Sequence, residues 1–267
     1  MPPFTFRQGT QPLLISMPHV GTYLPPHIEA QMTADAQRVP DTDWHLERLY
    51  DFADSLGASV LVATHSRYVV DLNRPPDNEN LYPGQDTTGL CPVDTFDKQP
   101  LYLHPSSQPD DQEIQHRREM LWRPYHEQLA AEMARLHATH GCAVLWDAHS
   151  IRSHVPRFFA GRLPDLNLGT ANGASCAPGL ANELLAIASA APGHTAVLNG
   201  RFKGGYITRH YGNPAANIHA IQLEMAQSTY MDETFPFQYQ EPLAAAIQPT
   251  LLQLLQAAIR YAQRGRR

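Results

Sequence analysis

The chain contains little cysteine: Cys91, Cys142 and Cys176 are the only three among 267 residues. Their number is odd and no two of them are spaced as C-x-x-C, which argues against a disulfide framework and against a thiolate zinc site. Cys142 stands inside an apolar run, where we expect an inert core residue.

Blocks of like charge are also missing, apart from the arginines at positions 264, 266 and 267. Charged residues make up 17% of the chain and the formal net charge is −6, so we expect no basic face for nucleic acid. No apolar run approaches the roughly 18 residues of a membrane span, and the N-terminus lacks the basic-then-apolar profile of a signal peptide. We therefore expect a cytoplasmic protein with no membrane partner.

The pattern that is present alternates apolar strands with amphipathic helices. With 43% hydrophobic residues, it predicts a single α/β domain over residues 1–267, with a mixed, mostly parallel sheet flanked by helices. The strands are expected at 13–17, 58–63, 68–72, 142–147, 195–198 and 218–225. The helices are expected at 42–56, 111–139 with a kink or boundary at Pro124, 178–189, and 241–263 with an interruption at Pro249.

Two long stretches show no periodicity, at 75–109 and 150–177, and 200–213 is rich in glycine and basic residues. A stretch as long as 75–109 without secondary structure is uncommon inside a compact domain. We interpret it as a loop flanking an active site.

Two histidines follow apolar segments that we expect to be buried strands. His19 comes after the first of them, and His149 comes after the segment at 142–147. Ligands of open α/β sheets bind beyond the carboxyl ends of the strands. Two imidazoles and one carboxylate are the usual protein ligands of a catalytic zinc ion, and we favour Asp43 over Asp41 and Glu47 as the carboxylate.

Each of these three residues also has a simpler interpretation. His19 and His149 could be ordinary loop or core histidines, and Asp43 could stabilise the start of a helix. Ser150 raises the alternative of a serine nucleophile, but no G-x-S-x-G turn surrounds it.

Glu224 alternates with apolar residues within 221–225. On a half-buried strand, Gln222 and Glu224 share one face. A carboxylate at such a place is either a paired structural acid or a general base beside a reacting water molecule, and both interpretations stay open.

Several cationic side chains, and one neutral amide, are suited to binding an anionic substrate. Asn73 and Arg74 follow the segment at 68–72, and Arg67 precedes it. Guanidinium groups bind carboxylates bidentately, so Arg67, Arg74 and Arg209 are candidates, although a single arginine is commonly a surface or ion-pair residue. Lys203 precedes a glycine pair that could shape a loop over a ligand, but neither a Walker loop nor a G-x-G-x-x-G turn is present.

Together these motifs resemble those of the N-formylglutamate amidohydrolases, and the matching segments run in order from about residue 13 to about residue 230. Any one segment is a weak signal, whereas the ordered combination is specific. The segments are SMPHVG at 16–21, DTDW at 41–44, SR at 66–67, DLNR at 71–74, DAHS at 147–150, FKGGYITRHYG at 202–212 and QLE at 222–224.

The resemblance implies the deformylase activity that ends one bacterial route of histidine degradation, namely hydrolysis of N-formyl-L-glutamate to formate and L-glutamate. A distant similarity to zinc carboxypeptidases implies a phosphorylase/hydrolase-like, zinc-carboxypeptidase-like fold. It carries over His19 and His149 as ligands of one Zn²⁺ ion and Glu224 as the general base. Carboxypeptidases place their ligand glutamate three residues after the first histidine, where this chain has Thr22, so the third ligand must come from elsewhere.

The same resemblance implies that Asn73 and Arg74 bind a carboxylate of the substrate. With Arg209, they would hold the two carboxylates of a small dianionic substrate, and Arg67 would help to stabilise the oxyanion. The rival hypotheses are another zinc amidohydrolase acting on N-acyl amino acids, a carboxypeptidase-like peptidase, and a non-catalytic anion-binding protein.

Overall fold

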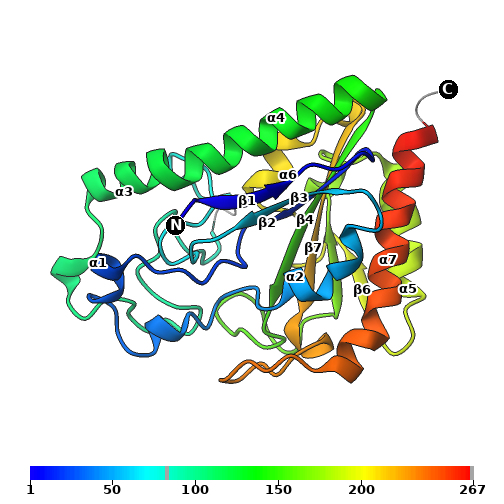
Figure 1. Cartoon of the computed structure of the whole chain (residues 1–267). Helices are drawn as coiled ribbons and strands as arrows, with labels where there is room; N and C mark the ends of the chain where they lie inside the picture. Colours follow the sequence, from blue (N-terminus) through cyan, green and yellow to red (C-terminus); the bar gives the residue numbers. More distant parts are fainter. Residues whose placement is uncertain (82–83, 265–267) are drawn as a thin grey trace.

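One mixed β-sheet forms the centre of the fold (Figure 1). The structure is a computed structural model and describes residues 1–81 and 84–264. The described strands are β1 (Phe4–Arg7), β2 (Leu13–Met17), β3 (Ser59–Ala63), β4 (Ala143–Ile151), β5 (Leu166–Gly169), β6 (Ala196–Leu198) and β7 (Ile218–Ala226). They pair in the order β1-β3-β2-β4-β7-β5-β6. Strands β3, β2, β4 and β7 are parallel, whereas β1 is antiparallel to β3 and β5 is antiparallel to β7.

Apolar side chains cover both faces of the central strands. All nine residues of β4 are buried. Along β2, Leu13, Ile15 and Met17 belong to the core on one face, and Leu14 belongs to the core on the other. A parallel sheet covered on both sides requires such continuous apolar segments, which explains why these strands could be recognised in the sequence.

Helices form a layer on each face of the sheet (Figure 1). On one face, α4 (Arg123–His140) and α6 (Tyr206–Tyr211) pack on residues such as Leu14 and Leu145. On the other face, α5 (Pro178–Ser189) and α7 (Glu241–Arg264) pack on residues such as Trp146. The first layer matters for the site, because Asp147 of β4 and Gln222 of β7 face it, where they contact Thr208 and Gly205. His149 and Glu224 follow at the alternate positions of the same strands and share that face.

The other helical segments are short. They are α1 (Pro26–Glu29), α2 (Leu46–Leu49), α3 (Asp111–Arg117), a π-helical turn at Arg118–Trp122, and 3₁₀ turns at Ala36–Arg38, Asp51–Ala53, Pro105–Ser107, Ala171–Gly173, Pro214–Ala216 and Gln227–Thr229.

Most of the expected strands are confirmed, but the strand expected at 68–72 is wrong. Its apolar side chains are buried, yet the segment forms turns, since Val69 N donates to Ser66 O and Asp71 N donates to Leu90 O. Two strands were missed, β1 and β5. Each is only four residues long, and β5 lies inside the stretch 150–177 that shows no periodicity.

The helix expected at 42–56 is largely wrong, because only α2 and one 3₁₀ turn form there. His45 has a φ of 62°, a left-handed conformation that keeps a helix from starting before Leu46. The boundary at Pro124 is confirmed: the proline cannot donate a backbone hydrogen bond, and the wider π turn directly precedes α4. The interruption at Pro249 is wrong, because α7 continues through it.

Of the remaining stretches, 200–213 contains α6, which the glycine-rich composition did not indicate. Within 75–109 the described residues form one 3₁₀ turn, and residues 82 and 83 lie outside the described part.

Helix α7 is long and apolar enough to cross a membrane by length and composition alone, which the sequence analysis did not anticipate. Half of its most apolar window is buried inside the protein. Its buried residues, among them Leu251, Leu254 and Leu255, pack in the core beneath β4, as those of a core helix do.

Candidate active site

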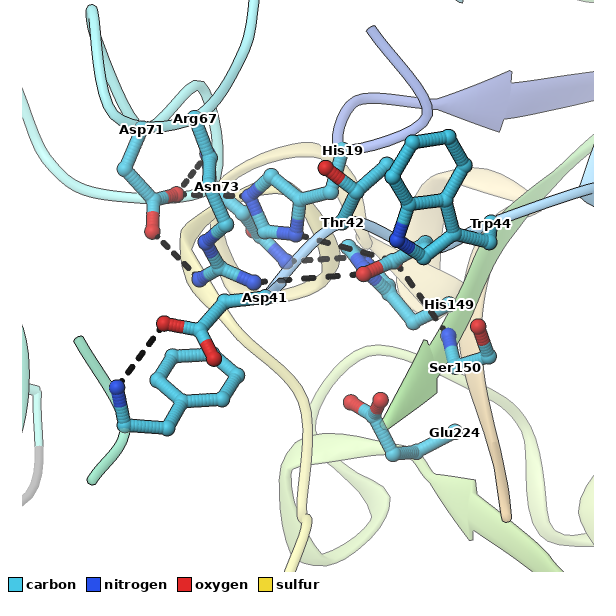
Figure 2. Close-up of polar contacts among 12 residues, drawn as sticks. His19, Asp41, Thr42, Trp44, Arg67, Asp71, Asn73, His149, Ser150 and Glu224 are labelled. Carbon is cyan, nitrogen blue, oxygen red and sulfur yellow. Dashed lines mark hydrogen bonds and ion pairs between the residues drawn. The ribbon is translucent and has the colours of Figure 1, made fainter. Parts of the chain in front are cut away.

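The structure brings His19, Asp43 and His149 together at the carboxyl ends of β2 and β4. His19 follows β2, whereas His149 lies within β4 near its carboxyl end, because that strand continues to Ile151. Figure 2 shows the two histidine rings side by side. One donor atom from each of the three buried residues lies within 4.8 Å of the others. Asp43 Oδ2 is 3.0 Å from His149 Nδ1 and 3.8 Å from His19 Nδ1. This cluster could bind a metal ion, because two imidazoles and one carboxylate form a suitable donor set.

The local backbone explains why these three side chains meet. Asp43 N donates to His19 O at 3.0 Å, which ties the segment before α2 to the end of β2. Asp43 Oδ2 also accepts from Ser150 N at 3.2 Å. Gly21, two residues after His19, lets this part of the chain pass directly against the backbone at His65, because a Cβ atom on residue 21 would lie 2.3 Å from His65 O. Asp43 is therefore part of a connection between strands and does not cap a helix.

Each histidine has a carboxylate at its other ring nitrogen. His19 Nε2 is 2.7 Å from Asp71 Oδ1, and His149 Nε2 is 3.2 Å from Asp147 Oδ1. Carboxylates placed in this way fix the ring orientation and the tautomer of histidines that bind metals. The sequence analysis quoted Asp71 and Asp147 only as parts of motifs. For Asp147 the available signal was its position two residues before His149, and for Asp71 it was its position at the end of an apolar segment, two residues before Asn73.

The protonation state of His19 suits metal binding. Burial lowers its pKa, and the nearby Arg67 charge lowers it further, so the imidazole is held neutral. Burial by itself would raise the pKa of Asp71, but His19, Arg67 and Arg74 outweigh it and hold that pKa well below the usual range. A neutral His19 that donates Nε2–H to the Asp71 carboxylate has its lone pair on Nδ1, the nitrogen that faces Asp43.

The two competing carboxylates lie elsewhere. Asp41 Oδ2 accepts from Tyr68 OH at 2.6 Å and from Phe96 N at 2.8 Å. Glu47 is exposed on α2 and lines a different groove of the surface.

Glu224 lies on β7, the strand that pairs with β4, and its side chain is buried near the cluster (Figure 2). As its alternation with Gln222 predicted, both side chains share one face, and Gln222 Nε2 donates to Glu224 Oε2 at 3.1 Å. Burial raises the pKa of Glu224 to about 8. A carboxyl group with a pKa near neutrality can both accept and return a proton.

A cavity of about 600 Å³, open to solvent, contains the reactive side chains. His19, His149 and Glu224 line it together with the guanidinium groups of Arg67 and Arg74. The buried Arg67 is bound by Asp71 at 2.7 Å and lies 3.9 Å from Asp43, and Arg74 donates to Thr88 O at 2.8 Å. The cavity therefore combines a possible metal site, a buried acid and fixed positive charge.

The segment 71–74 is bound to the helical layer through its backbone carbonyls. His126 Nε2 is 2.8 Å from Leu72 O, and Trp122 Nε1 donates to Arg74 O at 2.9 Å. On either side of the segment, Arg117 donates to Val69 O and Arg118 to Pro76 O. The π-helical turn and the start of α4 thus hold a segment that forms turns and has no strand partner.

Asn73 links this segment to the site. Its amide nitrogen is 2.9 Å from His149 Nε2 and 3.3 Å from Asp147 Oδ2. Its amide oxygen accepts from Ile207 N at 2.8 Å, at the start of α6. Asn73 lines the cavity, but these hydrogen bonds of its side chain are made to protein groups.

The other two cations proposed from the sequence are outside the cavity lining. Arg209 is exposed on α6, and its Nε donates to Gly204 O at 2.9 Å. Lys203 is half-buried, and its carbonyl accepts from Ala171 N at 2.6 Å. Arg201, which the sequence analysis did not single out, lines the cavity instead. The only signal for it was its place at the start of the same basic, glycine-rich stretch.

Three comparisons with known proteins point to the same family. The family described as N-formylglutamate amidohydrolase matches residues 11–231. Curated N-formylglutamate deformylases of Pseudomonas putida and Pseudomonas aeruginosa are each 54% identical over 257 residues, 96% of either chain. A crystal structure of N-formylglutamate amidohydrolase from Ralstonia eutropha JMP134 superposes with a TM-score of 0.84 at 26% identity, covering 99% of this chain and 100% of the other. The chain therefore belongs to the N-formylglutamate amidohydrolase family.

Proposed function

We propose that this protein hydrolyses N-formyl-L-glutamate to formate and L-glutamate, with one zinc ion held by His19, Asp43 and His149. The observation that carries the proposal is the cavity lined by His19, His149 and the buried Glu224, with Asp43 directly behind it, 3.0 Å from His149 Nδ1. The curated relatives that are 54% identical are named N-formylglutamate deformylases, which supports the choice of substrate.

The donor set suits the proposed ion. Zinc prefers imidazole nitrogen and carboxylate oxygen, and three protein ligands leave a position for water, as in catalytic sites. When bound, the ion lowers the pKa of that water and polarises the formyl carbonyl group. Asp71 and Asp147 act through the histidines, whose orientation they fix.

Glu224 is the proposed general base. It takes a proton from the attacking water and returns it to the amide nitrogen as the bond between the formyl carbon and that nitrogen breaks. Arg67 is the proposed stabiliser of the oxygen that becomes negatively charged. Its Nε is buried and has no hydrogen-bond partner among the described residues. A preorganised donor in a water-poor site stabilises developing charge without reorganisation.

Arg74 and Asn73 are the proposed binders of the α-carboxylate next to the reacting amide. Arg74 is fixed by Thr88, through both its carbonyl and its hydroxyl group, and it lines the cavity. A fixed guanidinium group restricts the orientations of a bound carboxylate and thereby aligns the amide.

Purified enzyme assayed side by side with formyl-, acetyl- and peptidyl-glutamate tests this function. We expect the formyl compound to be hydrolysed with the highest kcat/KM. We expect a chelator to abolish the activity and added zinc to restore it, with about one ion bound per chain. Preference for an acetyl or peptidyl substrate would indicate a rival amidohydrolase or peptidase, and failure to bind metal would favour the non-catalytic alternative.

Replacing Trp122 by phenylalanine tests the support of segment 71–74. The variant loses the hydrogen bond to Arg74 O. A single hydrogen bond contributes about 0.5–1.5 kcal/mol, and if this free energy is lost from substrate binding, we expect KM to rise about threefold to tenfold. We expect zinc content to be unchanged. Kinetic assays and metal analysis provide the measurement.

The matched control for this prediction is Trp146→Phe. Trp146 Nε1 also donates a buried hydrogen bond, to Tyr50 OH at 3.1 Å, but on the sheet face that α7 covers. We expect this variant to lose stability and keep its KM. An equal rise of KM in both variants would show that the effect comes from general destabilisation.

A further inference from the structure

The part of the cavity wall that the proposed mechanism does not use combines aromatic rings with a third guanidinium group. Phe96, Phe158 and Phe202 line the cavity, as does Arg201. Phe96 and Phe158 pack edge to face with their ring centroids 5.0 Å apart. Arg67 lies over Phe96 at 4.8 Å, and Arg201 lies 6.0 Å from the centroid of Phe158. Two packed rings therefore separate Arg201 from the arginine beside the metal cluster.

The backbone that carries Arg201 is held closely against the rest of the site. A Cβ atom on Gly169, at the end of β5, would lie 2.6 Å from Gly204 N. A Cβ atom on Gly205 would lie 2.5 Å from the side chain of Asn73, and Gly205 N donates to Gln222 Oε1 at 2.7 Å. These contacts leave no room for any residue but glycine, so the segment that follows Arg201 is fixed against residues of the catalytic cluster.

The Arg201 side chain is also oriented. Its Nε donates to Phe158 O, and its guanidinium group lies 5.3 Å from the centroid of the Phe202 ring. A guanidinium group held by its Nε and by aromatic rings loses little further freedom on binding a carboxylate, which lowers the cost of that contact.

We propose that Arg201 binds the side-chain carboxylate of the substrate, and that the aromatic rings contact the two methylene groups between its two carboxylates. The inference rests on the proposed function and deepens it. N-formylglutamate has one carboxylate beside the reacting amide and a second one beyond an apolar spacer. The cavity has the same sequence of features: Arg67 and Arg74 near the metal cluster, then Phe96 and Phe158, then Arg201.

The test compares kcat/KM for N-formyl-L-glutamate with that for N-formyl-L-glutamine, a neutral compound of nearly the same shape. We expect the wild-type enzyme to prefer the glutamate compound by at least about tenfold, as a charge-assisted hydrogen-bonded pair allows. In Arg201→Met we expect this preference to fall by at least about tenfold, through loss of activity on the glutamate compound only. In Arg201→Lys, which keeps the charge, an intermediate preference is expected.

The preference is a ratio measured on one enzyme preparation, so a lower folded fraction cancels from it. Arg260→Met, which removes an exposed arginine on α7, is the control and should keep the wild-type preference. A wild-type preference retained in Arg201→Met, or an equal loss on both substrates, would overturn the assignment of Arg201. A wild-type enzyme that hydrolyses neither compound would instead overturn the proposed function, whatever the variants show.

Discussion

We expect Glu224→Gln to bind as much zinc as the wild-type protein and to lose at least about a hundredfold in kcat, the lower end of the effect of a general base. Glutamine has nearly the shape of glutamate and can still contact Gln222, so the architecture of β7 should survive. The amide cannot accept the proton of the attacking water. Metal analysis and steady-state kinetics on the same preparation provide the measurement.

This expectation depends on where Glu224 lies. Glu224 and His149 are partners in the register of β7 and β4, and both side chains line the cavity. Burial raises the pKa of Glu224 to about 8, whereas a carboxylate with a purely structural role would be expected to have a cationic partner in contact. Among the described residues, its side chain is hydrogen-bonded to the neutral amide of Gln222.

Glu132→Gln is the matched control. Glu132 is also buried, on α4, where it contacts Ser59 and Arg135 away from the cavity. Its loss should lower the free energy of unfolding and leave kcat per folded molecule unchanged. If Glu224→Gln retains wild-type turnover, Glu224 has no part in proton transfer. If it loses its zinc, the role of Glu224 is to support the metal site.

The sequence was informative wherever a side chain's role follows from its position on a regular element. Strands β2 and β4 were recognisable because both of their faces are buried, and His19 and His149 could be placed at one edge of the sheet from those strands. Strand β7 was predicted as half-buried from its alternation, which placed Gln222 and Glu224 on one face, although the structure buries eight of its nine residues. Asp43 was chosen over its neighbours without a decisive reason. Only the tertiary contact with His19 O and Ser150 N distinguishes it.

The sequence failed where buried segments lack a regular backbone. The apolar residues at 68–72 predicted a strand. In the structure their side chains are packed in the core, but their backbone forms turns. Side chains of the neighbouring helices hold these turns by hydrogen bonds to the backbone carbonyls of Val69 and Leu72. The pattern of apolar and polar residues within 68–72 contains no information about such long-range contacts. The same applies to Arg201 and Arg209, which lie eight positions apart in one basic stretch, because only α6 and the packing of the glycine pair decide which of them reaches the cavity.

Asp71→Asn is expected to have the second large effect, on metal affinity and stability together. Asp71 is fully buried and contacts His19 Nε2, Arg67 and the backbone N–H of Asn73. Asparagine removes the charge and replaces one acceptor oxygen by a donor. Zinc affinity should fall about tenfold to a hundredfold, as for other lost carboxylate partners of ligand histidines. The free energy of unfolding should fall by about 3 kcal/mol, because Arg67 stays buried with less compensation.

The double variant Arg67→Met/Asp71→Asn separates these two roles of Asp71. Replacing both members of a buried ion pair is far less costly than removing one, so denaturant unfolding should show that much of the lost stability returns. Zinc affinity, measured by competition with a chelator, should not return, because His19 Nε2 still lacks its carboxylate. If the double variant recovers both properties, Asp71 serves only to neutralise Arg67. If Asp71→Asn alone keeps wild-type zinc affinity, the hydrogen bond to His19 does not prepare Nδ1 for the metal, and the proposed arrangement of ligands is wrong.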